Sequence, residues 1–145
     1  MRKRYVFAGG TVFPFDVERS AFFGGFGDGS ALLESLRATN LVMPLDVEGS
    51  VFTWVWRGLP WLVAFTTVER CATFAEAAGR DLEAIEVCTV RGAAVIEGMD
   101  RAPEPTGLVV DPASTDVMVF PPARAITPHC YIDEETGEAV RTWAA

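Results

Sequence analysis

The stretch that decides the fold is Val51-Phe-Thr-Trp-Val-Trp-Arg-Gly-Leu-Pro-Trp-Leu-Val-Ala-Phe65. Its two halves are rich in β-branched and aromatic residues, and Arg57-Gly58 between them suits a tight hairpin turn. A loop of two residues places Trp54 opposite Trp61 and Phe52 opposite Val63. One face of the hairpin is then entirely apolar. It carries Phe52, Trp54, Trp56, Leu59, Trp61, Val63 and Phe65.

The opposite face of this hairpin is also more apolar than polar. It carries Val51, Thr53, Val55, Arg57, Pro60, Leu62 and Ala64. A sheet with one face in water alternates more cleanly than this. We therefore expect either that helices cover both faces or that another molecule covers one of them. Which of the two faces is buried stays open.

The aromatic residues of the hairpin are the candidate partner-binding residues, because large aromatic side chains on a half-exposed sheet are frequent anchors at interfaces. The alternative is that these rings simply fill the core, since a domain of this size has to bury its tryptophans. The candidates are Phe52, Trp54, Trp56 and Trp61.

Helices are expected on both sides of the hairpin. Ser30 is the predicted cap of a helix that ends near Asn40, and Leu32, Leu33 and Leu36 form its apolar face. Thr66 and Glu69 fit a capping box at the start of a helix that ends at Gly79. A short third helix is predicted over 93–99.

Glycine and proline punctuate the remaining strands. We predict one short strand within 5–15, a mobile glycine-rich loop over 22–30, and a strand over 82–90 with Ile85 and Val87 in the core. Further strands are predicted at 41–45, 108–110 and 117–120, and a hairpin over 130–143 that turns at Gly137.

The alternation of strands and helices through the middle of the chain implies at least one parallel pairing. The predicted fold class is therefore α/β (α+β), a mixed β-sheet with about three helices in a single domain and a β-hairpin added at the C-terminus. Within it we distinguish an N-terminal strand and glycine-rich loop (1–30), a central α/β unit (31–122) and a C-terminal hairpin extension (123–145).

Charge and composition exclude several classes of function. The net charge of -8 argues against binding to nucleic acid, whose phosphates require Lys and Arg, and against an anionic membrane surface. The one dense basic run is Arg2-Lys3-Arg4. The apolar stretch after it is too short for a signal peptide, and no run reaches the roughly 18 apolar residues of a membrane span. We expect a cytoplasmic protein.

The sequence predicts no catalytic, cofactor-binding or metal-binding residue. Cys71, Cys88 and Cys130 are odd in number and lie far apart, which favours reduced thiols over a disulfide framework or a zinc site. His129, the one histidine, neighbours Cys130, but adjacent residues of a strand point to opposite faces and do not form a dyad.

Two further patterns have a structural interpretation. The glycines of 24–30 precede a helix but lack the Gly-Lys-Ser/Thr of a phosphate-binding loop, so a flexible linker is favoured. Asp133, Glu134, Glu135 and Glu138 do not have the spacing of a calcium-binding loop and fit a solvated hairpin tip.

Segments within Asn40–Pro121 resemble the N-terminal domain of the SseB family, the enhanced serine sensitivity proteins of bacteria. They are Leu41-Val-Met-Pro-Leu45, Gly58-Leu-Pro60 leading into Ala64-Phe-Thr-Thr67, and Gly107-Leu-Val-Val-Asp-Pro112. After the last of these strands the family pattern usually has an Asn-Pro turn, and this chain has Asp111-Pro112 there. The resemblance implies an α/β domain without established catalytic residues, and secretion-related or actinobacterial neighbourhoods that hint at protein partners.

Together these patterns predict a non-catalytic binding or scaffold module that presents the aromatic sheet face or the 22–30 loop. Its expected partner is another protein or a second copy of the chain. The alternative is a small-molecule-binding domain or small enzyme with a pocket that the sequence does not reveal, because α/β sheets often bind ligands beyond their strand ends.

Overall fold

The central hairpin forms in the predicted register. The computed structural model describes residues 5–7, 10–12, 14–25, 27–80 and 85–143. β4 (Thr53–Trp56) and β5 (Leu59–Ala64) run antiparallel, with Trp54 opposite Trp61. Arg57 and Gly58 have φ values of 53° and 76°, as the two central residues of a type I′ turn require.

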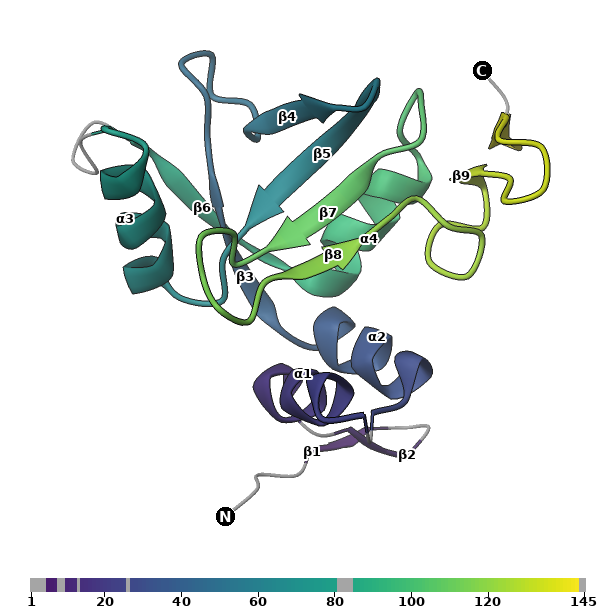
Figure 1. Cartoon of the computed structure of the whole chain (residues 1–145), viewed down its shortest axis with the longest axis horizontal. Coiled ribbons are helices and arrows are strands. Elements are labelled where there is room, and N and C mark those ends of the chain that lie inside the picture. The colour runs from purple at the N-terminus through teal and green to yellow at the C-terminus, as the bar shows by residue number, and fades with distance from the viewer. Residues whose placement is uncertain (1–4, 8–9, 13, 26, 81–84, 144–145) are drawn as a thin grey trace.

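The hairpin is one half of a mixed four-stranded sheet (Figure 1). β5 pairs in parallel with β7 (Gly107–Val110), and β7 pairs antiparallel with β8 (Met118–Phe120). The strand order is β4-β5-β7-β8, so β4 and β8 are the edges. The predicted parallel pairing and mixed sheet are confirmed.

The crossover between the parallel strands contains α3 (Val68–Ala77), β6 (Val87–Arg91) and α4 (Gly92–Asp100). β6 pairs antiparallel with β3 (Asn40–Pro44), and a bridge between Val42 and Phe65 joins this pair to the end of β5. The chain is therefore a small α+β domain, as predicted.

The larger part of the core lies on one face of the four-stranded sheet. Leu108, Val110, Met118 and Phe120 of β7 and β8 pack there against buried side chains of α4 and of α2 (Gly29–Arg37). Leu62 and Val51 of the hairpin pack against the same cluster. In Figure 1, α4 lies behind β7 and β8, so helices cover this face.

The opposite face of the sheet is covered only in part. Val63 and Phe65 are buried with Val42 and with Cys71 of α3, and Phe74 of α3 packs on this cluster. Farther along the same face, Val119 of β8 and Trp56 of β4 stay exposed. Helices therefore cover one face of the sheet, while the opposite face is covered beside α3 and exposed at Val119 and Trp56.

The N-terminal segment differs from the prediction. In place of one strand within 5–15 and a mobile loop over 22–30, β1 (Tyr5–Phe7) and β2 (Gly10–Val12) form a hairpin, and α1 (Phe15–Phe23) follows. The fold has four helices among the described residues, one more than the roughly three predicted. α1 was missed because a charged residue, Arg19, occupies its buried side.

Two predicted helix caps are wrong by one or two residues. α2 is capped by Asp28, whose carboxylate accepts a hydrogen bond from the Ser30 backbone N–H, so Ser30 is helical and not the cap. α3 is capped by Thr67, whose hydroxyl accepts from the Arg70 N–H, because the Thr66 hydroxyl donates elsewhere.

The end of α3 and the strand after it match the prediction in part. Gly79, with φ 71°, ends the helix, and its N–H and that of Arg80 bond to the last carbonyls, which is a Schellman motif. β6 begins at Val87, an exposed residue and not the predicted core residue, while Ile85 is half-buried. The predicted strand positions 82–84 lie outside the described residues, as does the basic run 2–4.

The C-terminal hairpin is confirmed. β9 (Cys130–Ile132) and β10 (Ala139–Arg141) pair antiparallel, and Gly137 takes the positive φ of 71° within the turn. In Figure 1 this hairpin lies to one side of the sheet, at the end of the chain opposite the β1–β2 hairpin. No helix among the described residues is long and apolar enough to cross a membrane.

Candidate functional site

The four candidate aromatic residues occupy different environments. Trp61 is 5% exposed and lies against Gly107 of β7, where even a methyl group would come within 2.3 Å of its ring. Trp54 is half-buried, with its ring 5.4 Å from that of Phe74 in α3. Phe52 is half-buried beside Trp54 at 6.1 Å. These three rings serve the domain's own packing.

Trp56 is the candidate aromatic residue that presents a large surface to solvent. Its side chain is 56% exposed. Its ring stands edge-on to Trp61 at 5.8 Å, and the Arg57 guanidinium lies 4.7 Å from it on the solvent side of the hairpin. The Trp61 indole N–H donates to the Trp56 backbone carbonyl at 3.3 Å. Trp56 is thus exposed and at the same time packed against Trp61 and Arg57.

The outer side of β4 is an open strand edge. In a hairpin with a two-residue loop, Trp56 and Leu59 form the closing hydrogen-bonded pair, and the pairs alternate from there. Val55 and Thr53 therefore direct their N–H and C=O groups away from β5. Pro60 opposite Val55 fits this alternation, because it has no N–H to give to β4. Among the described residues, no other strand pairs with this edge.

Val55 makes the edge apolar on the side away from Trp56. Its side chain is 80% exposed, although a β-branched residue at this position of a strand is usually covered. Val55 and Trp56 are consecutive, so one points to each face of the sheet. Sequence reasoning placed Val55 on the second apolar face of the hairpin but did not identify it as a binding residue, because the exposure of an edge depends on the strand order.

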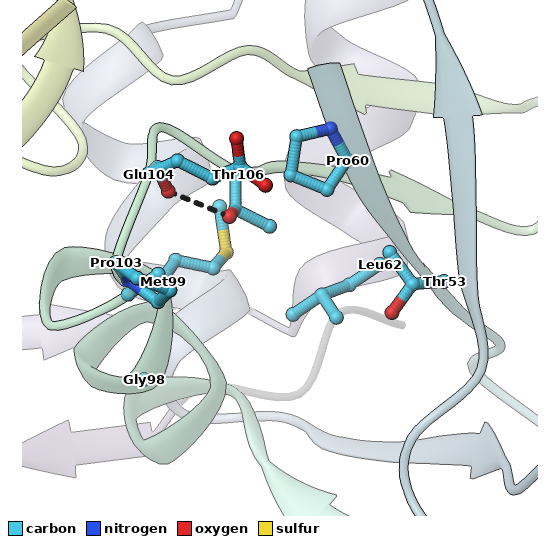
Figure 2. A pocket seen from close by; sticks show the side chains of 9 residues that line it. Thr53, Pro60, Leu62, Gly98, Met99, Pro103, Glu104 and Thr106 are labelled. Carbon is cyan, nitrogen blue, oxygen red and sulfur yellow. Dashed lines mark hydrogen bonds between the residues drawn. The ribbon is translucent and has the colours of Figure 1, made fainter. Parts of the chain in front are cut away.

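A shallow apolar groove lies beside the β4 edge (Figure 2). It has a volume of about 230 Å³ and runs between the hairpin and the C-terminal end of α4. Thr53, Pro60 and Leu62 form one wall. The other wall comes from α4 and the segment after it, with Gly98, Met99, Ala102, Pro103, Glu104 and Thr106. The Thr106 hydroxyl donates a hydrogen bond to the Glu104 backbone carbonyl at 2.9 Å, so the wall itself is mostly apolar.

A charged network lies at the carboxyl ends of the parallel strands β5 and β7. Asp111, fully buried, follows β7 with a φ of 56°. Its Oδ1 accepts from the Thr66 backbone N–H at 2.8 Å. Its Oδ2 accepts from the Thr66 hydroxyl at 2.8 Å, from Arg19 at 2.7 Å and from Arg70 at 3.2 Å. Both oxygens of the buried carboxylate thus accept hydrogen bonds.

Asp116 completes this network at its solvent side. It accepts hydrogen bonds from Arg70 and from Ser114, and it lies 3.1 Å from Arg19. The hydrogen bond from Arg70 is the main reason that the pKa of Asp116 is lowered from 3.8 to about 2. The same bond is the main cause that raises the pKa of Arg70. Two carboxylates thus neutralise two guanidinium groups.

The network accounts for an aspartate at position 111. Asn tolerates the positive φ of position 111 as well as Asp does. However, Arg19 of α1 is only 3% exposed and requires a charged acceptor at this place. The sequence indicated a turn at Asp111-Pro112 but gave no sign of the two arginines, which lie 92 and 41 residues away.

His129 pairs with Asp100 and not with Cys130. Its Nδ1 lies 2.7 Å from Asp100 Oδ2, and its backbone N–H donates to Asp100 Oδ1 at 2.8 Å. The Trp143 ring packs on the imidazole at 4.5 Å, and its indole N–H donates to the Asp100 carbonyl at 2.6 Å. These contacts dock the C-terminal hairpin on the end of α4.

The buried cysteines lie in apolar surroundings. Burial raises the pKa of the Cys71 thiol and is the main cause that raises that of Cys130. Cys130 lies 3.5 Å from the Ala102 carbonyl, to which its thiol donates. Both therefore behave as small apolar residues. Within the described ranges, no three His, Cys, Asp or Glu side chains gather closely enough to hold a metal ion.

Comparisons of the chain with models of protein families, with curated proteins and with solved structures gave no match.

Proposed function

We propose that the chain is a non-catalytic protein-binding module whose partner docks at β4. The observation that carries the proposal is an edge strand with two large apolar side chains, Val55 and Trp56, exposed on its opposite faces. Proteins usually protect such edges with charged residues, proline, a bulge or a covering loop, because an open edge recruits other strands. Within β4 itself, Thr53–Trp56, there is no charge and no proline.

The non-catalytic part of the proposal is supported by the surroundings of the reactive side chains. His129 is engaged by Asp100 and Trp143, and the buried Cys71 and Cys130 thiols have raised pKa values. A nucleophilic cysteine needs the opposite, a lowered pKa beside a cation or a base.

The membership in the SseB family is also a proposal. What supports it is that the three segments of the resemblance contribute to the strands at the centre of the fold: β3, β5, and β7 with the turn after it. A crystal structure of an SseB N-terminal domain in which the corresponding segments do not occupy the β3, β5 and β7 positions would contradict it.

Site-specific photo-crosslinking tests the binding function. We would replace Val55 with p-benzoylphenylalanine in the full chain and irradiate it in extract of the cells that encode it. Val47 is the matched control, because it is an exposed valine as well but lies in the turn before β4. We expect a discrete protein adduct from position 55 that is absent from position 47 and weakened by Trp56→Ala.

The same set of adducts from positions 55 and 47, or none from either, would contradict a binding site at β4. Circular dichroism and a thermal melt of each variant establish that the chain is folded before irradiation.

A small-molecule-binding domain is the second candidate function, and one observation favours it. The Arg19–Asp111–Arg70–Asp116 network lies at the carboxyl ends of two parallel strands, where α/β sheets commonly bind ligands. Its test is a thermal melt with inorganic phosphate or citrate added. A dose-dependent rise in Tm that Arg70→Gln abolishes would favour this candidate over the first.

A further inference from the structure

We propose that the β4 edge and the groove beside it form one binding site for an extended peptide segment that carries apolar and basic side chains. The segment adds as a fifth strand to the four-stranded sheet and places an apolar side chain in the groove between β4, β5 and α4. This inference rests on the proposed protein-binding function and specifies the chemistry of the partner.

The backbone of β4 supplies the first element of recognition. Thr53 and Val55 direct two N–H and two C=O groups outward, at the spacing with which a strand pairs. Strand addition to such an edge derives its affinity from these main-chain hydrogen bonds and its specificity from pockets for alternate side chains. An incoming segment is thereby held in an extended conformation beside β4.

The groove supplies the pocket. Thr53 and Val55 project their side chains to the same face of the sheet as Leu62, and this is the face on which the groove lies. Alternate side chains of an added strand extend the same face and so meet the groove. A cavity of roughly 150 Å³ is enough for a benzene ring, and the groove of about 230 Å³ accommodates a side chain as large as Leu or Phe.

Charge selects a basic segment and disfavours a second copy of the chain. Glu104 is the charged residue among those that line the groove, and its side chain is exposed at the rim. The whole chain carries a net charge of -8, which attracts a basic segment and repels a second copy with the same charge. The occupant is therefore a β-forming segment in which an apolar residue is flanked by Lys or Arg.

The test begins with selection of random heptapeptides displayed on phage against the purified full chain. We expect enrichment of sequences that alternate β-branched or apolar residues and contain Lys or Arg. Synthetic versions of the selected peptides are then measured by fluorescence polarisation. Failure to enrich any peptide, or enrichment of acidic or proline-rich peptides, would overturn the proposal.

Methylation of single backbone nitrogens in the selected peptide tests strand addition itself. An added strand uses only every second amide to pair with β4. Methylation of those amides should weaken binding about tenfold or more, and methylation of the amides between them should have little effect. Equal losses at all positions would overturn strand addition.

Two substitutions test the groove. Gly98 lies in α4 and lines the groove, and a Cβ added there meets no atom within 4 Å, so Gly98→Leu introduces a side chain into the groove and improves helix propensity. Ala93→Leu, at an exposed position on a different face of the same helix and outside the groove, is the matched control. We expect at least about a tenfold loss of peptide affinity for Gly98→Leu and none for Ala93→Leu. Equal affinities in the two variants would overturn the groove as the pocket.

Reversal of one charge tests the basic specificity. Glu104→Lys should weaken the Lys-containing peptide about tenfold and strengthen the same peptide with Glu in place of Lys. If the two peptides keep their order of affinity, the charge argument is refuted.

The crosslinking experiment separates this inference from the function on which it rests. A protein adduct at position 55 together with failed peptide selection would leave the binding function standing and remove the strand-addition mode. If neither a protein adduct at position 55 nor an enriched peptide is found, both the binding function and strand addition are refuted.

Discussion

The buried carboxylate of Asp111 should carry a large share of the stability of this domain, and Asp111→Asn isolates its charge. Asn has the same shape and tolerates the positive φ of 56°, so the backbone need not change. The substitution replaces one carboxylate oxygen by an NH₂ group. That NH₂ must then face either the Thr66 N–H or the guanidinium groups of Arg19 and Arg70, and all of these are donors.

The magnitude follows from what remains around Arg19. Removal of one partner from a buried ion pair costs about 3–5 kcal/mol, because the other charge stays buried without compensation. Arg19 keeps one contact, to Asp116 at 3.1 Å, which places the expected loss near the lower end. We therefore expect Asp111→Asn to reduce the free energy of unfolding by about 3 kcal/mol at pH 7.

Urea unfolding followed by tryptophan fluorescence measures this loss, with the denaturant slope m checked for constancy. The control is Glu97→Gln, which breaks the exposed ion pair between Glu97 and Arg101 and should change stability by less than about 0.5 kcal/mol. A loss below about 1 kcal/mol for Asp111→Asn would refute the argument, because the network would then not hold a buried charge.

Three further predictions follow from the same structure. The pKa of Asp116 is depressed from 3.8 to about 2, so its contribution is present above pH 4 and disappears as the pH falls towards 2. The full pKa difference corresponds to about 2 kcal/mol of stability, and because the side chain is one-third exposed we expect about 1 kcal/mol. This is measured as the difference in the free energy of unfolding between the native chain and Asp116→Asn, followed from pH 6 to 2.5. A gap that stays constant over this range would contradict the assignment. Gly107→Ala places a methyl group against the Trp61 ring and should cost about 1–3 kcal/mol with a shift in tryptophan emission, whereas unchanged stability would show that the ring can move aside. The Cys71 and Cys130 thiols should react with Ellman's reagent only on unfolding, in step with the urea transition, and rapid reaction of either in the native chain would disprove its burial.

The sequence predicts well those elements whose signals are local. The Arg57-Gly58 turn sets the hairpin register by itself, and Gly79 and Gly137 mark their turns in the same way. α1 could not be predicted, because a buried arginine breaks its apolar stripe and the acceptor that explains Arg19 lies 92 residues farther along the chain.

The candidate site could be predicted only in part for a related reason. The hairpin pattern indicated that Trp56 and Val55 lie on apolar faces, yet Trp56 was grouped with Trp54 and Trp61, which the structure places in the domain's own packing. The exposure of these side chains depends on which strand lies at the edge of the sheet, and no local sequence pattern determines the strand order. The groove could not be predicted because its second wall, which includes Gly98, comes from α4, a helix of the crossover that is distant in sequence from Thr53, Pro60 and Leu62.

The contact between Arg19 and Asp111 also orders the assembly of the chain. A ribosome releases α1 long before the turn after β7, so the buried guanidinium of Arg19 has no carboxylate to receive it while the hairpin and α3 are taking shape. Closing so long a loop costs entropy that only the finished sheet can offset. α1 can therefore dock only after the turn that follows β7 has been made, and we expect its backbone amides to exchange with solvent sooner than those of β5 and β7.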